Sequence, residues 1–135
     1  MILLIDTNVI IDVILERPDF VDDSLLTLEK AITIGDRVYI SSSSVTDIYY
    51  IIKRFTKSKE FALKSIQRLA SIIYFAEVNS ECILSAMQSR ISDFEDAVVD
   101  EVASNISADY IITRNIADFR EAKTKIISPR EYLDL

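Results

Sequence analysis

The sequence predicts an α/β fold of three layers, in which a central parallel sheet of about five strands carries helices on both faces. Short runs rich in Ile, Val and Tyr alternate with longer stretches whose apolar residues recur at helical spacing. The short runs are apolar throughout, as in strands that are buried on both faces. Alternation of strands and helices implies parallel crossovers. The 135 residues suffice for one core, so we expect residues 1–135 to form a single domain.

The predicted elements follow from these runs. The five strands are expected at 2–5, 37–40, 72–75, 110–113 and 125–127, and the helices at 9–15, 20–34, 45–55, 61–70 and 92 to about 105, with a last helix after Pro129. Gly35 is typical of a helix C-terminus. Ser92 and Glu95 have the spacing of a capping box, and Ser128 with Glu131 repeats it.

Composition excludes several kinds of catalytic site. The chain has no His, one Cys and one Gly, which rules out a His-based triad, a thiolate cluster and a Gly-rich phosphate loop. No apolar run approaches the roughly 20 residues of a membrane span, and the first residues lack the basic flank of a secretory signal. Cys82 forms no internal disulfide and is expected as a small core residue, which fits a cytoplasmic protein.

The net charge of −7 argues against broad, sequence-independent binding of nucleic acid. Basic residues nevertheless gather in one stretch that holds only Glu60 against them: Lys53, Arg54, Lys57, Lys59, Lys64 and Arg68. They form either a basic rim that suits a polyanion or two solvated helix faces. The rings of Tyr49, Tyr50 and Tyr74 could stack on bases, but core or half-buried packing is the more common fate and is expected here.

Four aspartates are the candidates for chemistry. Asp6 ends the first apolar run, Asp118 follows the fourth, and Asp47 and Asp96 fall near the starts of helices. Ligands of open parallel sheets bind beyond the carboxyl ends of the strands, where all four can meet. Carboxylates that meet repel one another, and a hard divalent cation relieves that repulsion. The pattern therefore predicts a metal site.

Each aspartate also has a structural interpretation. Asp6 could cap the helix that follows it, and Ser44 with Asp47 has the spacing of a capping box. Asp118 could belong to a polar turn. Asp93, Asp96 and Asp100 share one helix face. We choose Asp96 because Ala97, Val98 and Val102 bring that side against the core, and Asp93 is the reserve candidate.

Polar residues near Asp118 could support the site. Thr113 and Asn115 could orient Asp118 or hold a metal-bound water. Arg114 could instead pair with an acid and neutralise it.

The ordered set Asp6-Thr7-Asn8, Asp47, Asp96-Ala97, Thr113-Arg114-Asn115 and Asp118-Phe119 resembles the PIN domain, and within it the VapC-type toxins of bacterial toxin–antitoxin pairs. The resemblance implies a PIN-like fold and a metal-dependent endoribonuclease that holds Mg²⁺ or Mn²⁺. Asp6, Asp96 and Asp118 match the acids shared by the family, Thr113 the supporting hydroxyl residue and Asn8 the polar residue after the first acid. Asp47 stands where many members have Glu. The resemblance also implies an RNA substrate, a cognate antitoxin and a homodimer.

Two other functions remain open from the sequence. A receiver-like phospho-acceptor domain also gathers acids at strand ends in a doubly wound sheet. A PIN-like module that binds RNA or protein without cleaving RNA would show the same pattern of residues but would have no catalytic activity.

Overall fold

A computed structural model describes all of residues 1–135 and contains one sheet of five parallel strands in the order β3-β2-β1-β4-β5. The strands are β1 (Ile2–Ile5), β2 (Arg37–Ser41), β3 (Tyr74–Ala76), β4 (Tyr110–Ile112) and β5 (Ile126–Ile127). All five predicted strands are confirmed, each within two residues of its expected bounds. The order differs from the 2-1-3-4-5 order of flavodoxin-like domains, so the topology does not favour the receiver-like alternative.

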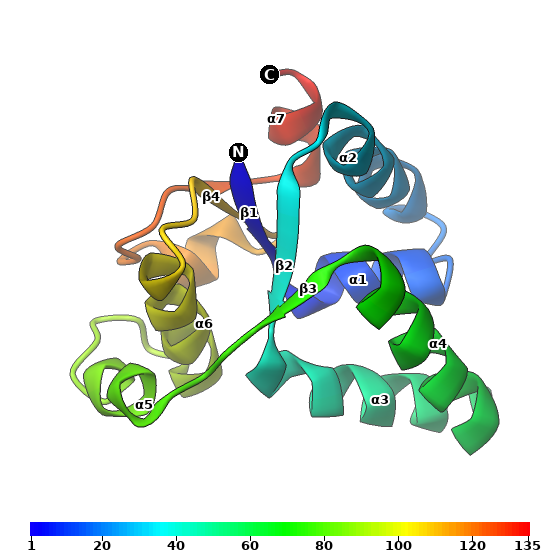
Figure 1. Cartoon of the computed structure of the whole chain (residues 1–135), viewed down its shortest axis with the longest axis horizontal. Helices are drawn as coiled ribbons and strands as arrows, with labels where there is room; N and C mark the ends of the chain where they lie inside the picture. The colour runs from blue at the N-terminus through cyan, green and yellow to red at the C-terminus, as the bar shows by residue number, and fades with distance from the viewer.

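Seven α-helices and one 3₁₀ helix surround the sheet (Figure 1). They are α1 (Thr7–Ile14), α2 (Val21–Ile34), α3 (Ser42–Thr56), α4 (Lys59–Ile72), α5 (Ser80–Ala86), α6 (Phe94–Asn105), η1 (Ile116–Phe119) and α7 (Pro129–Leu133). The helix α5 was not predicted. Its seven residues make two turns at most, too few to show a periodic apolar pattern.

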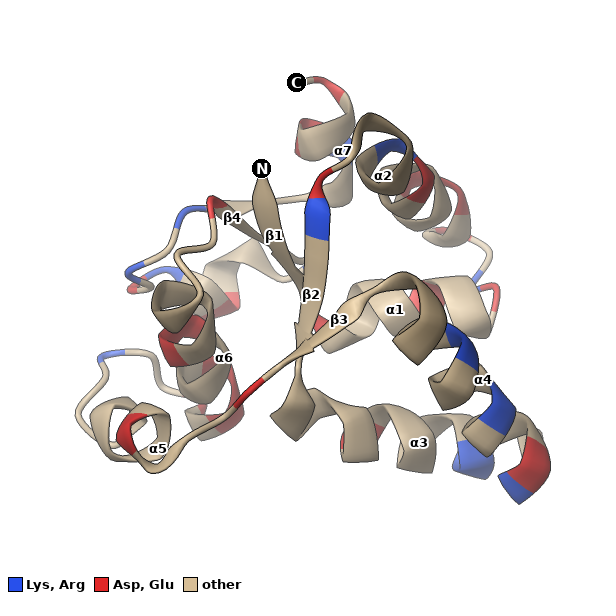
Figure 2. Cartoon of the chain, in the orientation of Figure 1, with Lys and Arg blue, Asp and Glu red and all other residues tan.

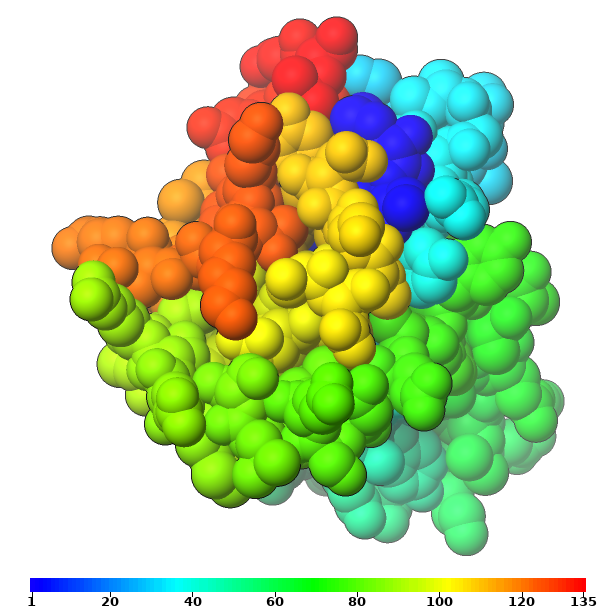
Figure 3. All heavy atoms as spheres, turned by 60° about the vertical axis from the view of Figure 1, so that its left-hand side comes forward, coloured from blue at the N-terminus to red at the C-terminus, as the bar shows by residue number.

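The two faces of the sheet carry separate cores. Leu3 and Ile5 of β1 point to one face and pack with α1, α2, α3 and α4, whereas Leu4 points to the other and packs with α5 and α6. Figure 1 shows these two helical layers on either side of the sheet. In Figure 3 the yellow α6 lies between the green α5 and the orange segment that precedes β5. That segment is tied to α6 because the buried Asp100 accepts from the backbone N–H of Lys123 and of Thr124. The predicted three-layer α/β fold is confirmed.

Helix ends test the capping predictions. Gly35 ends α2 in the left-handed region (φ 85°), and Ser128 with Glu131 forms a complete capping box. Two expectations were wrong. Ser41, not Ser44, caps α3, which places Asp47 in the second turn. Asp93, not Ser92, caps α6 by accepting from the N–H of Asp96, because Asp is an equally good cap one residue later.

Several aromatic side chains expected in apolar stripes are exposed. Phe55 is 72% exposed and Phe61 45%, at the end of α3 and the start of α4, where nothing covers the helix faces. Tyr50 and Tyr74 are 62% and 59% exposed, so core packing was wrong for both, whereas Tyr49 is half-buried as expected. Cys82 is buried, as predicted. No helix of the structure has the length and apolar character needed to cross a bilayer.

Candidate active site

The site begins where β1 and β4 end side by side. These central strands are paired in parallel, so Asp6 directly after β1 and Thr113 directly after β4 reach the same edge of the sheet. The Asp6 N–H donates to the carbonyl of Ile112 at 2.9 Å, which extends the ladder by one bond and fixes the Asp6 backbone. Both residues are buried, Asp6 at 8% and Thr113 at 0% exposure.

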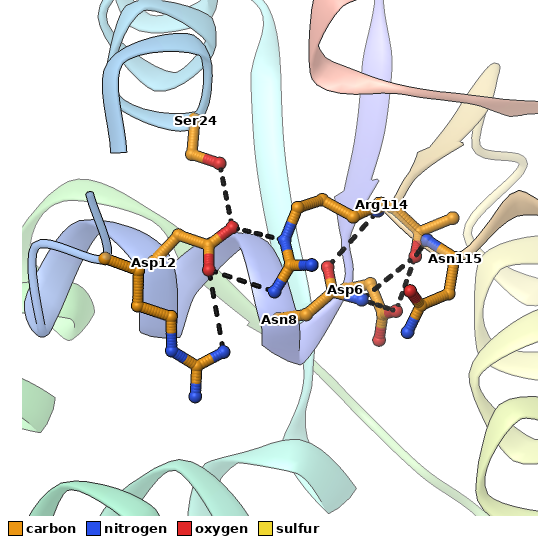
Figure 4. A network of polar contacts seen from close by, with 8 residues as sticks. Asp6, Asn8, Asp12, Ser24, Arg114 and Asn115 are labelled. Atoms are coloured by element: carbon orange, nitrogen blue, oxygen red, sulfur yellow. Dashed lines mark hydrogen bonds and ion pairs between the residues drawn. The ribbon is translucent and has the colours of Figure 1, made fainter. Parts of the chain in front are cut away.

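The Asp6 carboxylate has two roles at once. Its Oδ1 accepts from the Thr7 N–H at 2.8 Å and caps α1, as one interpretation predicted. Its Oδ2 accepts from the Thr113 hydroxyl at 2.7 Å and from the Asn8 side-chain amide at 3.1 Å (Figure 4). The Thr113 oxygen in turn accepts from the Asn115 N–H at 3.0 Å. Capping and site formation are therefore not alternatives, and Asn8 and Thr113 hold the acid in place.

Asp96 on α6 and Asp118 in η1 complete a group of three acids. No Lys or Arg lies within ion-pair distance of any of the three. Partial burial, followed by the charges of Asp6, Asp93 and Asp118, raises the pKa of Asp96 from 3.8 to about 7. Burial also raises the pKa of Asp6, and the charge of Asp118 adds to this, although hydrogen bonds from Thr113 and Thr7 and the charge of Arg114 oppose it. The charges of Asp6 and Asp118 therefore act on Asp96 from two other parts of the chain.

Asp47 lies beside the group rather than within it. Its acidic neighbour is Glu95 on α6, whose pKa is raised to about 7 by partial burial and then by a hydrogen bond to Asp47 and the charges of Asp47, Asp93 and Asp96. The sequence interpretation missed Glu95 as a site residue, because it assigned Glu95 to a capping box at the start of the helix. Asp93, the reserve candidate, caps α6 and contributes charge to Asp96.

A buried ion pair braces the loop that carries the supporting residues. Asp12 of α1 is fully buried, and its carboxylate binds the Arg114 guanidinium through two bonds, 2.6 Å from Nε and 3.1 Å from Nη2. Ser24 donates to Asp12 at 3.2 Å, and Arg17 lies 3.6 Å from it (Figure 4). The Arg114 N–H also donates to the Asn8 side chain. Arg114 thus pairs with an acid, as one alternative held, but with Asp12 and not with Asp118.

The Asp12–Arg114 pair had one visible signal in the sequence. Asp12 is an acid within an otherwise apolar helix, and a buried carboxylate requires a partner. The partner itself lies 102 residues away and could not be identified from the sequence.

The donor chemistry of the group fits a hard divalent cation. Carboxylate oxygens are the ligands that Mg²⁺ and Mn²⁺ prefer. The buried Thr7 hydroxyl, directly after Asp6, is the one buried side-chain oxygen or nitrogen without a hydrogen-bond partner in the chain. As they stand, no three acidic, Cys or His side chains converge closely enough to enclose an ion. Mutual repulsion keeps like charges apart, so a cation that binds here has to draw the carboxylates together.

The raised pKa values predict how metal-free stability depends on pH. An acid whose pKa is higher in the folded chain contributes stability that is complete below its unfolded pKa and is lost as pH rises through the folded pKa. With Asp96 and Glu95 near pKa 7, we expect the melting temperature in EDTA to fall between about pH 5 and about pH 8. Mn²⁺ should restore it at the upper end of that range. A melting temperature that is flat or rises across the same interval in EDTA would contradict the assignment.

Comparison with known proteins agrees with the fold and identifies the family of the chain. Residues 3–117 match the sequence profile of the PIN domain. No curated protein matches the sequence. Among solved structures, VapBC2 from Rickettsia felis bound to a promoter DNA fragment is similar with a TM-score of 0.77, at 20% identity over 95% of this chain and 98% of the other. VapBC-1 from nontypeable Haemophilus influenzae gives 0.70, at 19% identity over 96% and 99%. FitAcB from Neisseria gonorrhoeae gives 0.66, at 22% identity over 96% and 99%. The chain belongs to the PIN domain family.

Proposed function

We propose that this protein is a Mg²⁺- or Mn²⁺-dependent endoribonuclease that hydrolyses RNA phosphodiester bonds. One observation carries the proposal: three carboxylates without an ion-pair partner lie just after β1, in α6 and in η1 of a PIN-domain fold, where burial and the neighbouring acids raise the pKa of Asp6 and of Asp96. Such a group is costly unless a cation binds it, and no side chain need act as the nucleophile when a metal ion acidifies a bound water.

The roles of the residues follow from their positions. Asp6, Asp96 and Asp118 would hold the metal, and Asp47 is the fourth candidate. When bound, the metal supplies an acidified water and relieves charge on the phosphate oxygens. Thr113 and Asn8 keep the Asp6 carboxylate in one orientation by donating to its Oδ2. Asn115 holds the Thr113 hydroxyl through its N–H, so the loop that leads to Asp118 is bonded to the same group.

Asp47 and Glu95 act together in this proposal. Partial burial, followed by a hydrogen bond to Asp47 and the charge of Asp47, raises the pKa of Glu95 to about 7. Asp47 is not among the charges that act on Asp6 or on Asp96. We therefore assign Asp47 to the outer edge of the site and the three other aspartates to direct metal binding.

The similar structures are VapBC and Fit complexes, and we propose that this protein is likewise the toxin of a toxin–antitoxin pair, working in the cytoplasm with a cognate antitoxin. An apolar groove of about 420 Å³ between α1, α2 and α4 supports a protein partner. Its walls include Ile10, Val13, Leu28 and Ile72, and Lys64 and Arg68 line it as well. A homodimer is also proposed. Co-purification with the product of the neighbouring gene tests the pairing.

The proposed activity predicts metal-dependent cleavage. We expect purified protein to cut single-stranded RNA with Mg²⁺ or Mn²⁺ and to stop when EDTA is added, since the proposed mechanism draws its acidified water and its charge relief from the bound metal. The assay is gel analysis of a labelled RNA, with single-stranded DNA of the same sequence as a control for substrate class. Cleavage that survives EDTA would point to a contaminating nuclease or another mechanism.

The second candidate is a PIN-like module that binds RNA or protein without cleaving it. The splayed carboxylates favour it, since they do not enclose an ion as they stand. Binding of Mn²⁺ or RNA without any cleavage would support this module over the nuclease.

A further inference from the structure

One face of α3 connects the acidic site to the basic end of the helix. Asp47, Tyr50 and Arg54 are spaced by three and four residues, so they lie in one stripe along the helix surface, and Lys57, the C-cap residue, follows at the end of the helix. We call these four residues the α3 stripe. The stripe starts at Asp47, which hydrogen-bonds to Glu95 beside Asp96. From Asp47 it runs about 15 Å to Lys57, at roughly 1.5 Å per residue.

The far end of the stripe is the most basic part of an acidic chain. Residues 53–59 hold four of the 15 basic residues and none of the 22 acidic ones. All four, Lys53, Arg54, Lys57 and Lys59, are exposed and have no ion-pair partner. Figure 2 shows blue segments at the end of α3 and on α4, with a red segment beside them, whereas the segments coloured on α6 are red. The sequence left open whether these residues form a basic rim or two solvated helix faces. In the structure the four cations lie near the end of α3, and Asp47 lies closer to the start of the same helix.

The middle of the stripe presents an aromatic ring. Tyr50 is 62% exposed, and it packs edge-on against Tyr49 with ring centroids 5.3 Å apart and planes at 74°. Tyr49 is itself half-buried and lies under the Lys53 ammonium, 6.0 Å from its ring centroid. The Tyr50 ring therefore makes an edge-to-face contact with Tyr49 and remains open to solvent. An exposed ring that is supported in this way can stack on a base.

We propose that the α3 stripe binds the single-stranded RNA that extends from the cleavage site. Tyr50 stacks on a base, and Arg54 and Lys57 bind phosphates further along the strand. The inference rests on the proposed function, because it takes the acidic group to be the cleavage site. Binding of RNA to the stripe itself requires neither metal nor cleavage. The roughly 15 Å between Asp47 and Lys57 corresponds to about four stacked nucleotides at roughly 3.4 Å each.

Charge favours RNA over other occupants of this face. A second copy of this chain would offer only one acid on the stripe, Asp47, against the four cations at its basic end, so most of the positive charge would stay unpaired if α3 met α3. A polyanion meets unpaired cations and a free ring instead. Single strands bind through this combination of stacking and phosphate contacts.

The test measures RNA binding in EDTA, where cleavage is absent. The double variant Arg54→Gln/Lys57→Asn removes two charges and keeps polar side chains, and Asn tolerates the left-handed backbone (φ 57°) at position 57. The control Arg37→Gln/Lys125→Gln removes the same charge from exposed residues at the amino ends of β2 and β5, the opposite edge of the sheet. Tyr50→Phe and Tyr50→Leu test the ring. The probe is a labelled single-stranded RNA of about 12 nucleotides, followed by fluorescence anisotropy.

We expect the stripe variant to bind about tenfold more weakly and the control to stay within about twofold. The slope of log Kd against log salt should become shallower by about 1.4, because two phosphate contacts are lost at about 0.7 each. Tyr50→Phe should bind like the unmodified protein, and Tyr50→Leu about fivefold or more weakly.

Two results would overturn the proposal. One is equal loss of binding in the stripe and control variants, which would mean a net-charge effect only. The other is unchanged RNA affinity together with conversion of a dimer to a monomer in sedimentation, which would make the stripe an interface between copies. Circular dichroism excludes unfolding as a cause.

The same variants separate the stripe from the nuclease function. If the protein binds RNA through the stripe but never cleaves it, the stripe stands and the nuclease function fails. If the protein cleaves RNA and the stripe variants bind and cleave as well as the unmodified protein, the nuclease function stands and the stripe fails.

Discussion

Replacing Asp96 by Asn is expected to abolish RNA cleavage without lowering the stability of the metal-free protein. Asp96 accepts no hydrogen bond in the structure, and its charge is disfavoured by partial burial and by Asp6, Asp93 and Asp118. Its loss removes repulsion from the folded chain and one carboxylate from the proposed metal site. We expect cleavage to fall by a factor of about 100 or more, as when one charge-stabilising group is removed from an active site. The melting temperature in EDTA near neutral pH should stay the same or rise.

The matched control is Asp93→Asn, three residues earlier in the same helix. It removes the same charge, and Asn caps a helix about as well as Asp, so folding and most of the activity should remain. If Asp93→Asn abolishes cleavage while Asp96→Asn does not, the assignment of Asp96 as the metal ligand on α6 is wrong and Asp93 takes its place. Asp6 is a less clean probe, because an amide at that position would set a second NH₂ group against the Asn8 amide.

Among single substitutions of an Asp or Glu by Ala in this chain, Asp12→Ala should lower the free energy of unfolding the most. The Asp12 carboxylate is fully buried and is the partner of Arg114, Arg17 and Ser24. Its removal leaves the Arg114 guanidinium, which is 21% exposed and packed 3.8 Å over the Phe20 ring, without an anion. Breaking a buried pair from one side costs about 3–5 kcal/mol. Urea unfolding at pH 7 measures the change.

A double-mutant cycle with Arg114→Ala separates the pair from the site. Removing both partners should cost less than the sum of the single changes, because neither charge is then left buried alone. Glu60→Ala breaks the exposed pair with Lys64 and serves as the surface comparison, with an expected change below about 1 kcal/mol. A loss as small as this for Asp12→Ala would show that the Asp12–Arg114 bridge does not hold the loop after β4.

The strands could be predicted because of how they are buried. Residues of β1 and β4 are apolar at every position, and only a strand covered on both faces requires this. The placement of Asp6 and Thr113 followed, since parallel strands share one carboxyl edge. The helices α3 and α4 were predicted as elements, but their exposed rings were not. The same apolar spacing that marks a buried face in Ile48 and Ile52 continues into Phe55, which has no neighbour to cover it.

The rest of the site depends on contacts that no local pattern specifies. Arg114 was visible only as a cation next to Thr113, and its partner lies in α1. Glu95 looked like a first-turn residue of α6, and its link to Asp47 exists only because α3 and α6 face the same edge. The charges of Asp6 and Asp118 act on Asp96 only because the fold brings their segments to the same region, which the order of residues does not contain.

Direct measurement of Mn²⁺ binding shows whether acids from three distant segments jointly bind one kind of cation. Electron paramagnetic resonance at neutral pH counts free Mn²⁺ as protein is added, and no RNA or turnover is needed. We predict that the unmodified protein takes up Mn²⁺ and that Asp6→Asn, Asp96→Asn and Asp118→Asn each weaken uptake about tenfold or more, with Asp93→Asn close to the unmodified protein. Uptake that is absent, or that is equally strong in all four variants, would be incompatible with a metal site built from these three acids.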